Sequence, residues 1–163
     1  MALLKICQWI NDSGAATALR ESEIAFPIVE SIHVLAITLM AGTVSIVDLR
    51  LLGIVLKKEP VSQVAGQVLP LTWTGFAVMA ISGAMLSAAE AVKLYTNPAY
   101  RIKLVLLVLA GLNPMIFHST VYKSVSAWND WPRPPVRARV AAICSLTLWT
   151  AIIVSGRAIA YYH

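Results

Sequence analysis

ESIHVLAITLMAGTVSIVDLRLLG, residues 30–53, is the stretch that decides the fold class of this protein. Its segment 31–47 carries no charged residue, and a helix needs roughly 20 mostly apolar residues to cross the hydrocarbon core of a membrane. Three further uncharged segments follow, at residues 61–89, 104–122 and 140–156. The sequence therefore predicts an all-α integral membrane protein with four transmembrane helices.

Composition agrees with this class and argues against others. Of the 163 residues, 58% are hydrophobic and 13% are charged, whereas soluble domains carry about 25% charged residues. The net charge of +5 is attributed to membrane boundaries facing anionic headgroups, so a nucleic-acid partner is not expected. A P-loop, a nucleotide fingerprint, an H-E-x-x-H pair and a Ser-His-Asp spacing are all absent, which leaves open whether the protein is an enzyme.

Breaker residues divide the chain within a single transmembrane domain, residues 1–163. The Asn-Pro pair in TNPAY, residues 96–100, predicts a turn, because proline restricts the residue before it. Short connections between neighbouring helices favour an antiparallel four-helix bundle. We expect the helices at about residues 17–54, 63–93, 99–127 and 136–161.

Two regions are expected at the membrane surface. Residues 3–10 predict a short amphipathic helix that lies in the interface, with Trp9 as its anchor. The turn WNDWPRPP, residues 128–135, places Trp128 and Trp131 at the opposite interface.

Basic residues divide almost evenly between the two sides of the membrane. The compact basic run WPRPPVRAR favours its own side as cytoplasmic, which predicts a multi-pass protein of the bacterial inner membrane with both termini periplasmic. Seven basic residues lie on that side and six on the other: Arg50, Lys57, Lys58, Lys123, Arg133, Arg137 and Arg139 against Lys5, Arg20, Lys93, Arg101, Lys103 and Arg157.

His33 is the first candidate functional residue, because ionisable groups inside a membrane are costly and usually face the bundle interior. Three interpretations are open: an axial haem ligand, a hydrogen bond that ties helices together, or a proton relay. A ligating imidazole is oriented by an acceptor at its other nitrogen. Glu30 is three residues earlier, on nearly the same helix face, and could be that acceptor.

His118 is the second candidate and follows Asn113-Pro114. Proline inside a helix removes a backbone hydrogen bond and frees the carbonyl of Ala110, so a kink could open a pocket beside His118. The simpler alternative is that the Asn113 amide bonds at the kink and His118 bonds to a neighbouring helix.

The depths of the two histidines test whether they could ligate one iron. At 1.5 Å per residue, His33 lies about 9 Å to one side of the membrane centre and His118 roughly 7 or 8 Å to the other. The offset of about 16 Å indicates separate sites rather than one bis-histidine haem.

Arg101, Lys103 and Arg157 form a basic group near the interface on the His33 side. Such residues commonly extend to lipid headgroups. Alternatively they pair with haem propionates, for which Arg–carboxylate geometry is suited.

Asp48 and Arg50 end the first helix and, two residues apart, do not face each other. Each needs another partner, for which Arg137 and Arg139 are candidates. Small residues at 41–42, 45 and 82–83 favour close approach of helix backbones.

Two stretches together resemble a bacterial family of small four-helix membrane proteins of unknown function. They are HVLAITLMAGTVSIVDLRLLG and NPAYRIKLVLLVLAGLNPMIFH, and WPRPPVRARVAAICSLTLWTAIIVSGRAIAY is similar to the same family.

A looser likeness extends to HemJ-type protoporphyrinogen oxidases and copper-resistance D proteins, through His33, Gly42, Leu49-Arg50, Lys103-Leu104 and His118. Because the HemJ type binds haem b, the resemblance implies a haem b ligand at His33. The chain has Leu39-Met40 where that pattern has a tryptophan, and Asp48 where it has a proline. Porphyrinogen oxidation and copper transport are therefore not expected.

Two functional hypotheses follow. The first is a haem b-binding membrane protein in electron transfer, with His33 and His118 as iron ligands and Arg101, Lys103 and Arg157 holding propionates. The alternative is a non-enzymatic structural or assembly subunit of a larger membrane complex, associated with other subunits or with further copies of itself.

Overall fold

The computed structural model describes residues 2–161, a range that is helical and contains no strand. Its long helices are α3 (Ala25–Leu51), α4 (Val61–Ala89), α6 (Pro98–Ser119) and α7 (Val136–Ala158). Each is long and apolar enough to cross a membrane, α7 with its continuation η2 (Ile159–Tyr161). The prediction of an all-α membrane protein with four transmembrane helices is confirmed.

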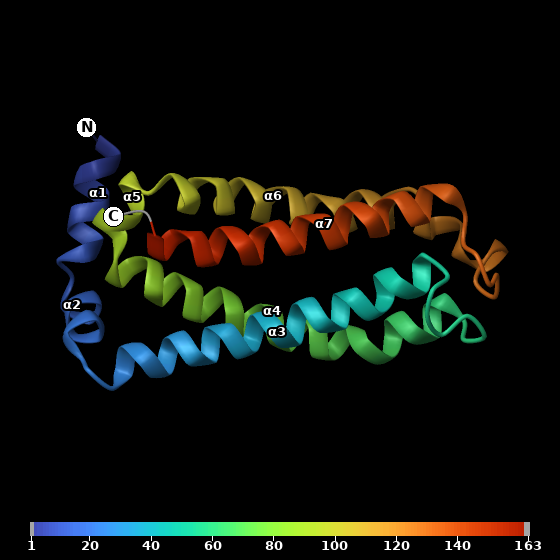
Figure 1. Cartoon of the computed structure of the whole chain (residues 1–163), viewed down its shortest axis with the longest axis horizontal. Coiled ribbons are helices and arrows are strands. Elements are labelled where there is room, and N and C mark those ends of the chain that lie inside the picture. The colour runs from blue at the N-terminus through green and yellow to red at the C-terminus, as the bar shows by residue number, and fades with distance from the viewer. Residues whose placement is uncertain (1, 162–163) are drawn as a thin grey trace.

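The four long helices lie along one axis and alternate in direction (Figure 1). Helix α3 pairs with α4, α6 pairs with α7, and α3 contacts α7, which joins the two pairs. We call the end near α1 the α1 end, and the end with residues 52–60 and 120–135 the loop end. Helix α1 (Ala2–Asn11) runs across the bundle axis at the α1 end (Figure 1), and its Trp9 is 77% exposed.

The first predicted helix, 17–54, is two helices in the structure. Helix α2 (Gly14–Glu21) ends at Ser22, whose backbone is extended, and α3 begins at Ala25. The Ser22 hydroxyl accepts a hydrogen bond from the Ala25 N–H at 3.0 Å. Pro27 falls in the first turn of α3, where a missing N–H costs nothing because that group has no helical partner.

The next two predicted helices, 63–93 and 99–127, are also shorter than expected. Glu90 leaves helical geometry, so α4 ends at Ala89 and α5 (Ala91–Thr96) follows as a separate short helix. Helix α6 ends at Ser119, and Tyr122–Ala127 form the 3-10 helix η1. Asn97 begins α6 by accepting a hydrogen bond from Tyr100 N–H at 3.2 Å, as its Asn-Pro sequence favours.

A hydrophobic cluster closes the loop end. It joins α3, α4, α6, α7 and the residue after η1, through Leu51, Val61, Phe117, Trp128, Ala138 and Ala142. Trp128 is 4% exposed, so the expectation of an interfacial side chain is wrong for Trp128, whereas Trp131 is 52% exposed.

Close packing of α3 and α4 depends on a glycine that the sequence reasoning did not select. A Cβ at Gly75 would lie 3.0 Å from the Met40 backbone nitrogen. Gly42, which was expected at a close approach, has no atom within 4 Å of such a Cβ. The pattern of small residues therefore identified the helix pair and missed the contact point.

Candidate functional site

His33 lies in α3 toward the α1 end and is half-buried. Its Nδ1 is 2.9 Å from the hydroxyl oxygen of Ser82 in α4. The Met79 backbone, about one turn earlier in α4, is a second hydrogen-bond partner of the ring. The imidazole is therefore oriented by the neighbouring helix.

The hydrogen bonds of Ser82 favour one position for the ring proton of His33. Its single hydroxyl proton is donated to the Val78 carbonyl at 2.6 Å. With that proton on the Val78 carbonyl, the oxygen can accept from His33, which assigns the ring N–H to Nδ1. In the neutral ring Nε2 then carries a lone pair, which is the form that can bind a metal.

Two glycines make room for polar side chains at this level. A Cβ at Gly83 would lie 2.9 Å from His33 Cε1, so only glycine leaves the ring its position. In α7, a Cβ at Gly156 would lie 3.6 Å from the Lys103 Nζ, so the lysine side chain lies over Gly156. Lys103 is half-buried and within electrostatic range of His33. The structure thus brings together an imidazole from α3 and an ammonium from α6.

Within residues 2–161, the other residues predicted for this site make no hydrogen bond with His33. Glu30 is exposed and within electrostatic range of His33, and Ser82 takes the orienting role that was expected of Glu30. Arg101 is exposed and donates two hydrogen bonds to the Tyr95 carbonyl, at 3.1 and 2.7 Å, with its guanidinium over the Tyr95 ring. Arg157 is exposed in the last turn of α7.

His118 is exposed at the loop end of α6. Its Nδ1 donates to the Pro114 carbonyl at 2.9 Å, within its own helix, and its ring lies 4.8 Å from that of Tyr122. The expected bond from His118 to a neighbouring helix is therefore wrong. Asn113 makes the interhelical bond instead, from its amide to the Ala141 carbonyl in α7 at 3.1 Å.

The two histidines lie at different depths. Helices α3 and α6 both run from the α1 end to the loop end (Figure 1). His33 is about 12 Å along α3 and His118 about 30 Å along α6, at 1.5 Å per residue from Ala25 and Pro98. One iron between both imidazoles does not fit this arrangement.

Asp48 and Arg50 form hydrogen bonds near the loop end. The Asp48 carboxyl is hydrogen-bonded to Ser145 in α7, so the expected partners Arg137 and Arg139 are wrong. Arg50 is 0% exposed and donates to the carbonyls of Glu59 at 2.8 Å and Trp131 at 3.2 Å, which belong to the two loops. One oxygen of Asp48 and one nitrogen of Arg50 are buried without a hydrogen bond.

Within residues 2–161, no three His, Cys, Asp or Glu side chains are grouped so that they could hold a metal ion. An apolar groove of about 200 Å³ lies on the surface between α3 and α4, lined by Leu35, Leu39, Gly75 and their neighbours. His33 does not line this groove. His33 thus offers one imidazole nitrogen as a metal donor, with the Lys103 ammonium and the Glu30 carboxylate within electrostatic range.

Sequence reasoning missed the roles of Ser82, Gly83 and Gly156. Ser82 and Gly83 were noted as small residues only. Counting depth along the antiparallel α4 from its turn would have placed them near His33, because each residue advances 1.5 Å. Gly156 carried no such signal, since the Lys103 side chain that covers it is long.

Comparison with known proteins places the chain in a family. No curated protein and no solved structure matches it, so the more distant likeness to HemJ-type and copper-resistance proteins gains no support from these searches. A family model described as a family of unknown function, DUF6644, matches residues 22–162. That range contains His33, Ser82, Lys103 and all four long helices. The chain therefore belongs to the DUF6644 family, whose function is unknown.

Proposed function

We propose that this protein binds haem b within the membrane and takes part in electron transfer, with His33 as an axial ligand. The observation that carries the proposal is the fixed orientation of His33. Its Nδ1–H is bound by Ser82 on α4, so that Nε2 offers a lone pair. A haem-ligating histidine needs this combination of a bound N–H and a free nitrogen.

A porphyrin fits the donor set better than a bare metal ion. The described residues offer no cluster of three ligands, whereas a haem supplies four nitrogens and needs one or two bonds from the protein. The Lys103 ammonium, which is within electrostatic range of His33, would pair with a propionate carboxylate. Bound haem would supply the iron that accepts and releases an electron.

Each protein residue has a defined task in this proposal. Ser82 holds the ring tautomer, Gly83 leaves space for the ring, and Gly156 lets Lys103 lie close to α7. Arg101 and Arg157 are not assigned to the propionates, because Arg101 is bound to Tyr95 and both are exposed.

Optical spectra of the purified protein test the proposal. Wild-type protein should show Soret and α bands in a reduced-minus-oxidised spectrum, and His33→Ala should lose them. His118→Ala is the matched control and should keep both bands, because His118 lies at the other end of the bundle. Wild-type protein without these bands, or His33→Ala with unchanged haem content, would exclude haem ligation by His33.

A second candidate function is that of a structural or assembly subunit in a larger membrane complex. The exposure of α6 favours it, because 6% of its most apolar stretch is buried, against 28% in α3 and in α7. A partner helix or another copy of the chain would bury this surface. Copurification of a stable partner with haem-free protein would favour this function over the first.

For the location, we propose the bacterial inner membrane with both termini periplasmic, on the basis of the basic run at residues 131–139 at the loop end. A phosphatase fusion at the C-terminus should be active, because that enzyme folds only outside the cytoplasm. An inactive phosphatase fusion paired with a fluorescent C-terminal reporter fusion would reverse the orientation.

A further inference from the structure

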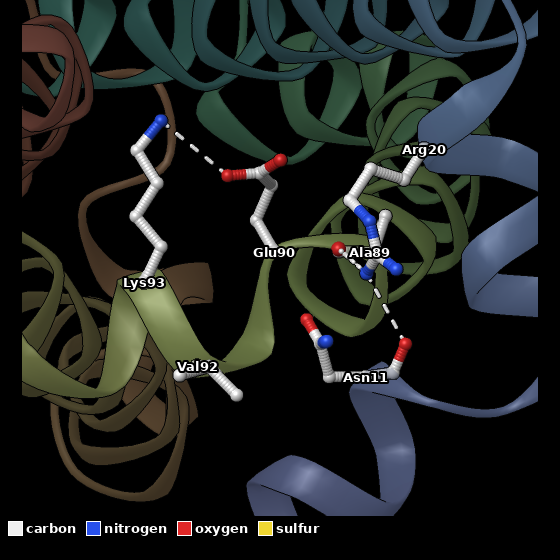
Figure 2. Close-up of a pocket in the computed structure, with 6 residues that line it drawn as sticks. All are labelled: Asn11, Arg20, Ala89, Glu90, Val92 and Lys93. Carbon is white, nitrogen blue, oxygen red and sulfur yellow. Dashed lines mark hydrogen bonds and ion pairs between the residues drawn. The ribbon is translucent and has the colours of Figure 1, made fainter.

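A charged cavity of about 330 Å³ lies at the α1 end, apart from the His33 site. Figure 2 shows the residues that line it, with Glu90 drawn between Lys93 and Arg20. They come from four helices and the junction of α4 with α5: Asn11, Arg20, Ala89, Glu90, Val92 and Lys93. The volume is within the range of small-ligand sites.

The cavity lies at the height of the membrane boundary. The transmembrane helix α4 ends at Ala89, which is one of the lining residues. Helix α1, whose last residue Asn11 also lines the cavity, exposes Ile6 and Trp9 at 52% and 77%. Exposed apolar side chains with a tryptophan are typical of a helix in the lipid interface. An occupant of this cavity would therefore meet a helix suited to the lipid interface as well as charged side chains.

Arg20 holds the cavity together. One guanidinium nitrogen donates to the Asn11 carbonyl at 3.1 Å and to the Ala89 carbonyl at 2.9 Å. These bonds connect α1, α2 and the end of α4, and they satisfy carbonyls that a helix terminus leaves open. Because Arg20 is already engaged, Lys93 is the cation available to a ligand.

Lys93 and Glu90 form an exchangeable ion pair. The distance between Lys93 Nζ and the Glu90 carboxylate is 3.4 Å, and the side chains are 56% and 27% exposed. An exposed pair of this kind contributes little to stability, so an incoming anion can replace Glu90 as the lysine's partner. Two cations against one carboxylate leave the lining with a net charge of +1.

We infer that this cavity binds the headgroup of phosphatidylglycerol. The phosphodiester carries one negative charge, which matches the charge of the lining, and would pair with Lys93. The glycerol hydroxyls would donate to the Glu90 carboxylate released from Lys93, and the acyl chains would lie along the exposed apolar face of α1. Phosphatidylcholine has no hydroxyl or N–H to offer Glu90 and is bound more weakly.

Native mass spectrometry of the delipidated full-length protein tests this inference. Phosphatidylglycerol or phosphatidylcholine with identical acyl chains is added, and the fraction of protein that retains one lipid is measured. Lys93→Gln should weaken phosphatidylglycerol retention about fivefold, the effect of one basic residue near a lipid headgroup. Lys57→Gln, the same change in an exposed loop at the other end, should leave retention unchanged.

Glu90→Gln gives the opposite sign. Gln keeps an oxygen that can accept from the glycerol hydroxyls and removes the charge that competes for Lys93, so phosphatidylglycerol retention should strengthen. If the ion pair were purely structural, both substitutions would lower retention equally. Equal retention of the two lipids, or no effect of Lys93→Gln, would overturn the inference. Displacement of the lipid by equimolar free glycerol phosphate would also overturn it, by identifying a site for soluble anions.

Discussion

Arg50 at the loop end of α3 and His33 toward its α1 end are both polar side chains on the same apolar helix, but they use their hydrogen-bonding groups differently. Arg50 is completely buried and donates to backbone carbonyls of both loops. His33 is half-buried and is held by Ser82 and the Met79 backbone of α4, and with the proton on Nδ1 its Nε2 is left for another partner. Arg50 therefore serves the fold, whereas His33 is the better candidate for binding.

The loops around Arg50 strengthen this contrast. Asn129 accepts from the backbone of Val61 at 3.0 Å and of Ser62 at 2.8 Å, so the loop before α7 is bonded to the start of α4. Gly53, with a φ of +68°, passes so close to Pro132 that a Cβ would lie 2.6 Å from its carbonyl oxygen. Backbone contacts of this kind leave no room for a ligand around Arg50.

Arg50→Met should have the largest effect on stability. It deletes charge-assisted hydrogen bonds to two loops while keeping much of the side-chain volume, and we expect a loss of about 3 kcal/mol in the free energy of unfolding. Unfolding in mixed detergent micelles measures it, with the exposed Arg139→Met as control. Equal stability of the two variants would remove the structural role assigned to Arg50.

Gly83→Ala should have the next largest effect. It tests the space around the His33 ring without changing any charge. The added methyl would lie 2.9 Å from the ring, so the ring or α4 must move at a cost of about 1–3 kcal/mol. Gly42→Ala, where a Cβ meets nothing within 4 Å, is the control and should be close to neutral. A neutral Gly83→Ala variant would show that the ring has other room.

Ser82→Ala should cost about 1 kcal/mol of stability and lower haem affinity about 10- to 100-fold, as loss of a ligand's orienting partner does. Haem titration of the apoprotein and the unfolding assay measure the two effects separately. Unchanged haem affinity in Ser82→Ala would contradict the orienting role, whatever the stability.

Thr72→Val removes a hydrogen bond that joins α3 to α4 and does not involve His33. It is therefore the comparison for Ser82→Ala. Thr72 donates to Thr43 across the α3–α4 pair at 2.8 Å, and such bonds in membranes are worth about 0.6 kcal/mol. The variant should lose about this much stability and keep any haem spectrum of the wild type. A loss of haem in Thr72→Val would mean that α3–α4 packing in general, rather than Ser82, controls the site.

Much of the architecture was predictable from sequence, because apolar length determines whether a helix can cross a membrane. Helix ends were less predictable. Ser22 and Glu90 interrupt predicted helices through local backbone geometry, and neither residue type is a strong breaker. Trp128 was misassigned because a tryptophan next to a turn suits an interface and a core equally well.

The sequence by itself determined that the chain is a bundle of four membrane helices and that His33, Asp48 and Arg50 need polar partners, because lipid offers none. Only the tertiary structure decided which partners they have. Ser82 for His33 and Ser145 for Asp48 come from other helices, and the loop carbonyls for Arg50 are brought close by folding. These partners depend on the rotation and depth of each helix. A helix that is apolar on all sides does not specify its rotation or its depth.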